Sequence, residues 1–252
     1  MTTYFVEDTT VLLGRSMRHI TRSLDTIITV TIMPIALMLM FVYVFGGAID
    51  TGSVPYVNYL LPGILLITIV MGISYTAFRL FTDLQSGIFE RFLSLPIIRS
   101  SILWAHVLTS LVSTLVSLAL VVIVAVLIGF RSSADLLAWL AVAGILTLFT
   151  MGLTWLAVIP GLSASTVEGA SAFAYPLIFL PFVSSAFVPT ETMPPVVRAF
   201  AEHQPVTPIV NTIRDLLAGQ PAGDVWVALA WCVGILVVAY ALAMAKYGRK
   251  VT

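Results

Sequence analysis

Charge is scarce in this sequence. Only 10% of its 252 residues are Asp, Glu, Lys or Arg, and 60% are hydrophobic, whereas typical soluble domains are roughly 25% charged. The twelve basic and twelve acidic residues cancel, so the sequence offers no strongly basic surface for phosphates and excludes nucleic acid as a partner. With a mean hydropathy of +1.07, the composition favours a protein embedded in the lipid bilayer.

Cysteine and histidine are also rare. The single cysteine, Cys232, lies inside an apolar run and suits a small buried hydrophobe, so neither disulfides nor metal-ligand spacing is expected. The three histidines, His19, His106 and His203, fall in separate segments. No His-Glu-x-x-His, Gly-x-Ser-x-Gly or glycine-rich phosphate loop with Lys-Ser/Thr occurs. The sequence therefore predicts no catalytic residues, no metal site and no ATP site of its own.

Long apolar runs are abundant, and they set the fold. Runs of about 20 residues match some 30 Å of hydrocarbon at 1.5 Å per residue. We expect an all-α bundle at residues 27–252 with six transmembrane helices at about 27–45, 59–78, 102–130, 136–159, 170–188 and 225–245. No interior Asp, Glu, Lys or Arg occurs in these runs, which argues against an ion-coupled pump. Four prolines are expected to kink the spans: Pro34, Pro62, Pro176 and Pro181.

The distribution of basic residues predicts the orientation. Lys and Arg accumulate in cytoplasmic flanks, and nine of the twelve fall on one side of the six spans, leaving only Arg131, Arg198 and Arg214 on the other. Both termini are therefore expected in the cytoplasm.

The first 26 residues have the pattern of an interfacial helix. Leu13, Met17, Ile20 and Leu24 recur at steps of four, three and four, and the arginines of this segment point the opposite way. We expect a cytoplasmic helix on the inner leaflet, with its arginines near anionic lipid. A solvated basic flank is the alternative.

The loop between the second and third spans is unusually apolar. Apolar residues surround the pair Glu90-Arg91, and Pro96 is expected to stop a helix that begins near Thr82 or Asp83. Such a helix suits docking to another protein, although packing under the bundle is an equal alternative.

Prolines divide the outer stretch between spans five and six. Pro194-Pro195 and Pro208 are expected to open two short helices, the second with an apolar face. These helices are too short to span and are expected to dip into the outer leaflet, with a simple surface cap as the alternative.

This order of parts resembles the permeases of type 2 ABC transporters, especially the daunorubicin-resistance-like drug and lipid exporters. The resemblance rests on Gly87-Ile-Phe-Glu-Arg-Phe-Leu-Ser-Leu-Pro96 followed by Arg99, and on Phe187-Val-Pro-Thr-Glu-Thr-Met-Pro-Pro-Val-Val-Arg198, continued by Gln204-Pro205 and residues 207–217. The family usually has Asn-Pro where this chain has Gln204-Pro205.

The resemblance implies a multi-pass location in the bacterial plasma membrane, and it implies a mechanism. Two permeases, identical or paired, dock on two cytoplasmic ABC ATPase subunits that bind ATP and Mg, and the loop before span three is the coupling helix. Its implied contacts are Leu84, Gln85, Gly87, Ile88, Phe89, Glu90, Arg91 and Phe92. A drug, lipid or glycolipid would leave the cytoplasm or inner leaflet along spans one, two and five. The aromatic residues implied on this path are Phe41, Tyr43, Phe45, Tyr75, Phe173, Tyr175, Phe179 and Phe182.

Other functions fit parts of the pattern. A polysaccharide-exporting ABC permease shares the architecture, and a non-ABC structural or assembly membrane protein fits the spans alone. Aromatic residues in spans also serve packing and interfacial belts. An intramembrane enzyme is disfavoured by the separated histidines, and a secondary transporter or channel by the absence of charge within the spans.

Overall fold

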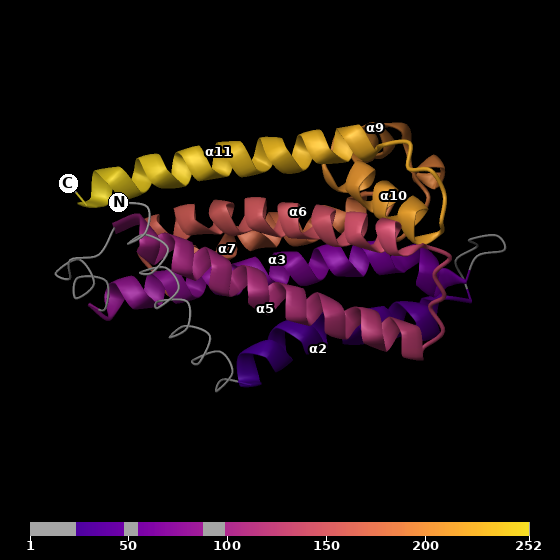
Figure 1. Ribbon diagram of the computed structural model, residues 1–252, viewed down its shortest axis with the longest axis horizontal. Helices are drawn as coiled ribbons and strands as arrows, with labels where there is room; N and C mark the ends of the chain where they lie inside the picture. Colours follow the sequence, from indigo (N-terminus) through magenta and orange to yellow (C-terminus); the bar gives the residue numbers. More distant parts are fainter. Residues whose placement is uncertain (1–23, 48–54, 88–98, 252) are drawn as a thin grey trace.

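Every regular element that the computed structural model describes, within residues 24–47, 55–87 and 99–251, is a helix (Figure 1). In chain order these are α2 (Leu24–Met40), the π-helix η1 (Phe41–Phe45), α3 (Tyr56–Gln85), α5 (Arg99–Leu127), α6 (Leu136–Ser163), α7 (Val167–Ala172), α8 (Ala174–Phe179), the 3₁₀ helices η2 (Pro181–Val183) and η3 (Thr190–Thr192), α9 (Pro195–His203), α10 (Val206–Leu217) and α11 (Val225–Val251). The all-α prediction is confirmed. The predicted interfacial helix falls on residues 1–26, of which 1–23 lie outside the described ranges.

Four helices are long and apolar enough to cross a membrane: α3, α5, α6 and α11. They contain nearly all of the segments predicted as spans two, three, four and six. The segments predicted as spans one and five hold shorter apolar stretches, Thr31–Phe45 and Val167–Val183. Length and composition therefore identify four candidate spans directly in the described part of the chain.

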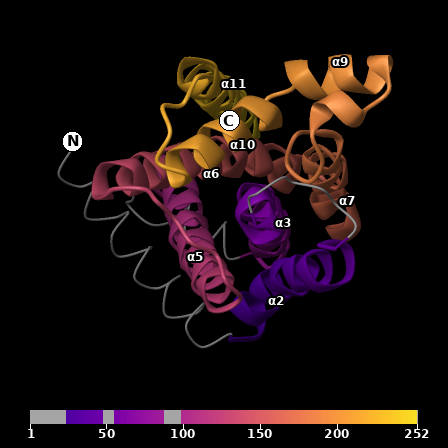
Figure 2. The same ribbon diagram turned by 90° about the vertical axis from the view of Figure 1, so that its right-hand side faces the viewer.

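The central helix of the bundle is α3 (Figure 2). In its most apolar stretch 83% of the residues are buried, whereas the corresponding value for α11 is 22%. A helix that is apolar on all sides favours this central place, because each face then meets another apolar helix. Its largest buried side chains include Leu60, Leu61, Ile64, Leu65 and Ile73.

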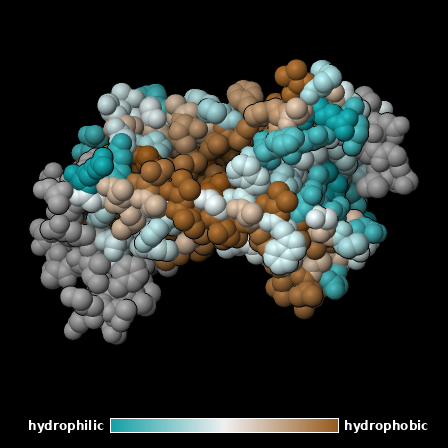
Figure 3. Space-filling model, turned by 90° about the horizontal axis from the view of Figure 1, so that it is seen from above, coloured by the Kyte–Doolittle hydropathy of each residue, from teal (hydrophilic) through white to brown (hydrophobic). Residues whose placement is uncertain are grey.

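The outer surface carries an apolar band. Seen from the side of α11, apolar residues gather in the middle of the molecule and hydrophilic residues gather at both ends (Figure 3). On α11 the exposed apolar side chains include Val233, Val237, Val238 and Leu242. Such a band matches the hydrocarbon layer, which covers apolar side chains at no cost in hydration.

Close helix contacts depend on small and hydroxyl-bearing residues, as is usual where lipid provides no hydrophobic driving force between helices. The α6 backbone approaches α11 at Gly152, where a Cβ would lie 3.2 Å from the Leu236 nitrogen. Between α2 and α5, Thr31 Oγ1 donates a buried hydrogen bond to Ser117 Oγ at 2.9 Å. These contacts fix helix neighbours in a core otherwise held by dispersion.

The fifth predicted span is not one continuous helix in the structure. The segment forms α7, α8 and η2, and the chain then extends at Ser184 (φ −147°, ψ −177°). Pro176 lies in the first turn of α8 and Pro181 at the first position of η2, where a missing N–H costs least. By contrast, Pro34 and Pro62 lie inside α2 and α3 without ending them.

Candidate functional site

Four phenylalanine rings meet where the end of the first predicted span contacts the end of the fifth predicted span. Phe187 stacks on Phe41 with ring centroids 4.9 Å apart and on Phe182 at 5.0 Å. Phe41 also lies 5.4 Å from Phe45. We call Phe41, Phe45, Phe182 and Phe187 the aromatic cluster. Because Phe41 and Phe45 bound the π-helix η1, the cluster includes a helix type that is frequent at functional sites.

The aromatic cluster is closed on one side and open on the other. Phe187 is only 3% exposed, whereas Phe45 is 42% and Phe182 38% exposed. Offset or tilted ring pairs of this kind contribute about 0.5–1.5 kcal/mol beyond the area they bury. The open rings therefore offer a rigid apolar surface to a flat or lipidic molecule, or to a second subunit.

Phe187 is held against α3 by a close backbone approach. A Cβ at Gly63 would lie 2.7 Å from the Ala186 Cβ, so only glycine lets this segment lie so close to α3. The Tyr56 hydroxyl donates to the Phe187 carbonyl oxygen at 3.3 Å. The buried side of the cluster is thereby fixed to the central helix.

The other aromatic residues predicted on the substrate path lie elsewhere. Tyr43, Tyr175 and Phe179 are well exposed on the outer faces of η1 and α8. Tyr75 pairs with Phe78, a residue of the same helix, at 5.7 Å, and Phe173 packs half-buried against the core. The structure thus brings three of the eight predicted residues together and adds Phe187, which the sequence analysis had not selected.

Gln204 donates hydrogen bonds to backbone carbonyl oxygens that have no helical partner at the break in the fifth predicted span. Its side-chain amide nitrogen donates to the Leu180 oxygen at 2.9 Å and to the Val183 oxygen at 2.5 Å. Ser184 Oγ donates to the Pro181 oxygen at 2.6 Å. Buried carbonyls without partners cost free energy, so these contacts stabilise a non-helical turn inside the bundle. The position where this chain departs from the usual Asn-Pro therefore has a structural role.

Arg214 joins three segments at the same end of the molecule. Its guanidinium donates to the Tyr59 oxygen on α3 at 3.2 and 3.3 Å, to the Ser185 oxygen at 2.7 Å and to Asn211 Oδ1 at 3.1 Å. It also lies 3.9 Å over the Tyr59 ring. Burial lowers the pKa of this guanidinium, and Tyr59 and Asp215 oppose that shift. The sequence analysis had counted Arg214 only as an outer charge. The sequence feature that could have indicated this role is Asn211, which lies one turn earlier on the same helix and accepts a hydrogen bond from Arg214.

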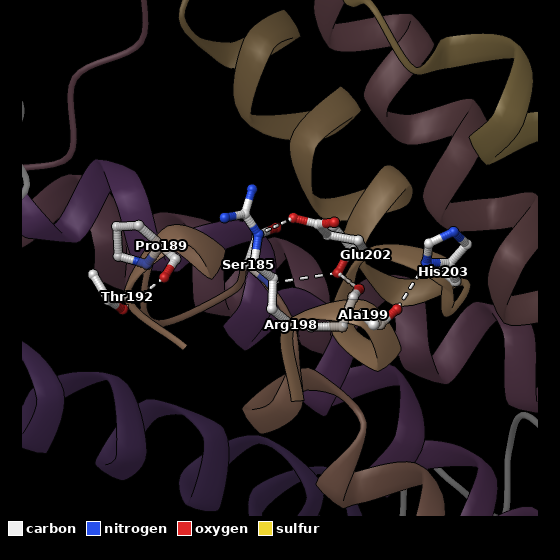
Figure 4. A network of polar contacts seen from close by, with 9 residues as sticks. Ser185, Pro189, Thr192, Arg198, Ala199, Glu202 and His203 are labelled. Carbon is white, nitrogen blue, oxygen red and sulfur yellow. Dashed lines mark hydrogen bonds and ion pairs between the residues drawn. The ribbon is translucent and has the colours of Figure 1, made fainter. Parts of the chain in front are cut away.

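The short helix α9 closes this end with exposed polar groups. Figure 4 shows Arg198 and Glu202 turned toward one another, with Arg198 Nε 2.7 Å from Glu202 Oε1, and His203 near the Ala199 oxygen. As predicted, Pro195 is the first residue of α9. The next helix, α10, begins at Val206 rather than at Pro208, because Pro205 already has helical backbone angles and serves as the cap.

The helix α3 continues past the predicted start of the coupling helix. Thr82 and Asp83 lie inside α3, so neither is an N-cap, and that prediction was wrong. Thr82 Oγ1 donates to the Phe78 oxygen one turn earlier. The helix ends at Gln85, and Gly87 follows with φ +70°, a conformation that favours glycine.

Of the implied coupling residues, the structure describes Leu84, Gln85 and Gly87. Leu84 packs against an apolar cluster of the bundle and Gln85 is exposed. Ile88, Phe89, Glu90, Arg91 and Phe92 lie outside the described residues. His106 Nε2 of α5 lies 3.3 Å from Asp83 Oδ2 of α3, and this contact joins the two helices that precede and follow residues 88–98 in the sequence.

Comparison with known proteins places these features in context. The family model for the ABC-2 type transporter matches residues 7–218. The daunorubicin resistance ABC transporter permease protein DrrB1 of Streptomyces coeruleorubidus is 33% identical over 230 residues, which cover 89% of this chain and 80% of that protein. The probable doxorubicin resistance ABC transporter permease protein DrrC of Mycobacterium tuberculosis is 27% identical over 243 residues, covering 93% and 86%.

Proposed function

The chain belongs to the ABC-2 type transporter family, and from this premise we propose that it exports a hydrophobic or amphipathic molecule: a drug, lipid or glycolipid. A permease of this family is a multi-pass membrane protein without ATPase activity of its own, so a separate ATPase subunit supplies the energy. The substrate leaves from the cytoplasm or the inner leaflet. ATP and Mg are bound by the ATPase.

The aromatic cluster is the observation that carries the substrate class. Its open rings, Phe45 and Phe182, come from the first and fifth span segments, at the place where the resemblance puts the substrate path. Its exposed surface consists of phenylalanine rings, which favour flat or lipidic molecules over highly hydrated ones. The names of the relatives, which refer to daunorubicin and doxorubicin resistance, support a polycyclic aromatic drug.

The assembly we propose contains two permeases and two ATPase subunits. Exposed apolar residues on η1 and α8, such as Tyr43 and Phe179, support contact with a second permease along these segments. ATP-driven closure of the ATPases acts on the loop before α5 and rocks each bundle as a rigid body. The residues that transmit this motion are those between Leu84 and Leu95, with Glu90 and Arg91 as polar contacts.

The export assay tests the substrate class. Cells that contain the permease and its partner ATPase are expected to expel daunorubicin in an ATP-dependent way, and the double variant Phe45→Ala/Phe182→Ala to expel it about tenfold more slowly. Loss of two stacking rings corresponds to that factor. Leu242→Ala, which truncates an exposed apolar side chain on α11, is the matched control and is expected to keep the wild-type rate.

Two results contradict this proposal. Unchanged export by the double variant removes the aromatic cluster from the substrate path. Absence of ATP-dependent movement of daunorubicin and of fluorescent phospholipid in the wild-type complex removes the proposed substrate class.

The proposed topology has six spans with both termini in the cytoplasm. The two shorter apolar segments, α2 with η1 and α7 to η2, complete the six crossings together with the four long helices. Figure 1 supports an even number of crossings. The end of α3, the start of α5 and the end of α11 lie at one end of the bundle, and α9 and α10 lie at the other. The distribution of Lys and Arg supports the direction.

Cysteine labelling tests this orientation. In a Cys232→Ser background, Thr192→Cys is expected to react with an impermeant maleimide in intact cells, and Ser86→Cys only after permeabilisation. Both positions are exposed, so access to the reagent depends on the side of the membrane. The reverse pattern would show that the chain is inserted the other way round.

A further inference from the structure

An apolar cavity of about 210 Å³ lies between α3, α6, α8, α10 and α11. Its floor consists of buried residues: Val70 of α3 with Phe149 and Leu153 of α6. Leu177 of α8, which is half-buried, and Trp231 of α11, which is 40% exposed, line its mouth. The cavity is therefore a side pocket that leads from the apolar band of the surface into the bundle.

The break in the fifth predicted span borders the cavity. Leu180 and Pro181, at the turn between α8 and η2, form part of its wall. A broken helix normally leaves carbonyl oxygens that attract water, but Gln204 donates to the oxygens of Leu180 and Val183. The lining residues are apolar, so the pocket resembles cavities that stay dry and take up small hydrocarbons; an engineered cavity of roughly 150 Å³ binds benzene.

The pocket is separate from the aromatic cluster. The two sites use different residues of the broken fifth span: Leu177, Leu180 and Pro181 line the pocket, whereas Phe182 joins the aromatic cluster. The mouth is bounded by α11, and this helix exposes apolar side chains such as Val233 and Val237 on the surface of the bundle. A molecule that enters the pocket therefore comes from beside α11.

The depth of the pocket fits the inner half of one leaflet's hydrocarbon, toward the centre of the bilayer. At α11's start, Trp226 is 80% exposed, and tryptophan favours the interface between headgroups and hydrocarbon. At 1.5 Å per residue, Trp231 lies about 7.5 Å and Ile235 about 13.5 Å further along the helix. One leaflet contributes about 15 Å of hydrocarbon. The stretch of α11 that lines the pocket thus lies at the depth of the terminal half of a lipid's acyl chains.

We propose that this pocket binds a segment of an acyl chain from a phospholipid of the leaflet next to α9 and α10. An empty cavity loses dispersion contacts along its whole lining, and an acyl chain restores them without needing a polar partner. The bound chain supports the break between α8 and η2 through contacts with Leu177, Leu180 and Pro181. The phospholipid is a structural ligand of the permease and is not exported from this pocket.

Photo-crosslinking tests the proposal. The permease with its partner ATPase is placed in bilayer nanodiscs that contain phosphatidylethanolamine with a diazirine in one acyl chain, and labelled peptides are identified by mass spectrometry. Labelling is expected at the floor, on the peptides of Val70 or Leu153. Val70→Phe fills the floor and is expected to lower this labelling about tenfold. Excluding about two methylene groups of the acyl chain from the pocket corresponds to a tenfold loss of binding.

Two further variants make the result specific. Val237→Phe adds the same ring on an outward-facing position of α11 and is expected to leave floor labelling unchanged. Leu177→Trp narrows the mouth from a half-buried position, and it keeps the test decisive if Val70→Phe does not fold. Labelling confined to outward-facing residues such as Val233 overturns the proposal. Removal of floor labelling by added daunorubicin also overturns it, because the pocket would then bind substrate.

Discussion

Replacing Glu90 and Arg91 together by alanine is expected to weaken binding of the partner ATPase roughly a hundredfold and to abolish ATP-driven export. The two residues are the charged pair of an otherwise apolar loop. Polar residues surrounded by apolar ones at an interface often cost about 2 kcal/mol each when truncated, and about 2.7 kcal/mol in total already corresponds to a hundredfold loss of affinity. Co-purification with the ATPase and substrate-stimulated ATP hydrolysis measure the effect.

The matched control is the exposed ion pair of Arg198 and Glu202. This pair is exposed on α9, at the opposite end of the bundle from the end of α3. Exposed ion pairs contribute about 0–1 kcal/mol, so Arg198→Ala/Glu202→Ala is expected to keep both ATPase binding and export. The prediction is contradicted if the Glu90/Arg91 variant and a series of substitutions from Leu84 to Leu95 all keep the wild-type ATPase binding and substrate-stimulated ATP hydrolysis. This loop would then not belong to the interface with the ATPase.

The long helices follow directly from the sequence, because length and hydropathy alone decide them in lipid. The predicted start of the sixth segment at residue 225 and of the fourth at residue 136 agrees with α11 and α6. The end of α3 was harder to predict. Thr82 and Asp83 are good N-cap residues, but a threonine hydroxyl also bonds the carbonyl one turn earlier inside a helix, as Thr82 does with Phe78.

The broken fifth span depends on a residue distant in sequence. Pro176 and Pro181 indicated kinks, yet prolines in membrane helices are also tolerated without a break, as Pro34 and Pro62 show. What allows a full break is the Gln204 side chain, which lies 24 residues from Leu180 in sequence. A local pattern contains no information on this contact.

The candidate site was predictable only in part for the same reason. Aromatic residues could be assigned to spans one and five, but which rings meet depends on η1 and on the turn after η2. Phe187 joins the cluster because Gly63 admits its segment to α3. Pairing between segments about 120 residues apart therefore decides the site, and apolar periodicity within one segment does not report it.

Replacing Arg214 by methionine is expected to lower the free energy of unfolding by about 2–4 kcal/mol. Methionine keeps much of the apolar stem but removes every donor, so the oxygens of Tyr59 and Ser185 lose their charged partner. Hydrogen bonds to charged groups contribute about 1.5–3 kcal/mol each, and the contact with the Tyr59 ring adds to this. Reversible unfolding in mixed micelles with increasing dodecyl sulfate measures the change.

Two substitutions separate the geometry of Arg214 from its charge. Arg214→Lys keeps the positive charge but replaces the planar fork by a point donor, so an intermediate loss is expected. Arg131 lies at the same end of the bundle, and its guanidinium donates to nearby carbonyls, those of Val126 and Phe130. Its contacts with Asn58 use the backbone and are kept in Arg131→Met, which is therefore expected to cost less than about 1 kcal/mol. Equal losses for Arg131→Met and Arg214→Met would mean that positive charge at this end, rather than the link between α3, α10 and the turn at Ser185, stabilises the fold. Full stability of Arg214→Lys would show that the charge alone suffices and that the bridging geometry contributes nothing.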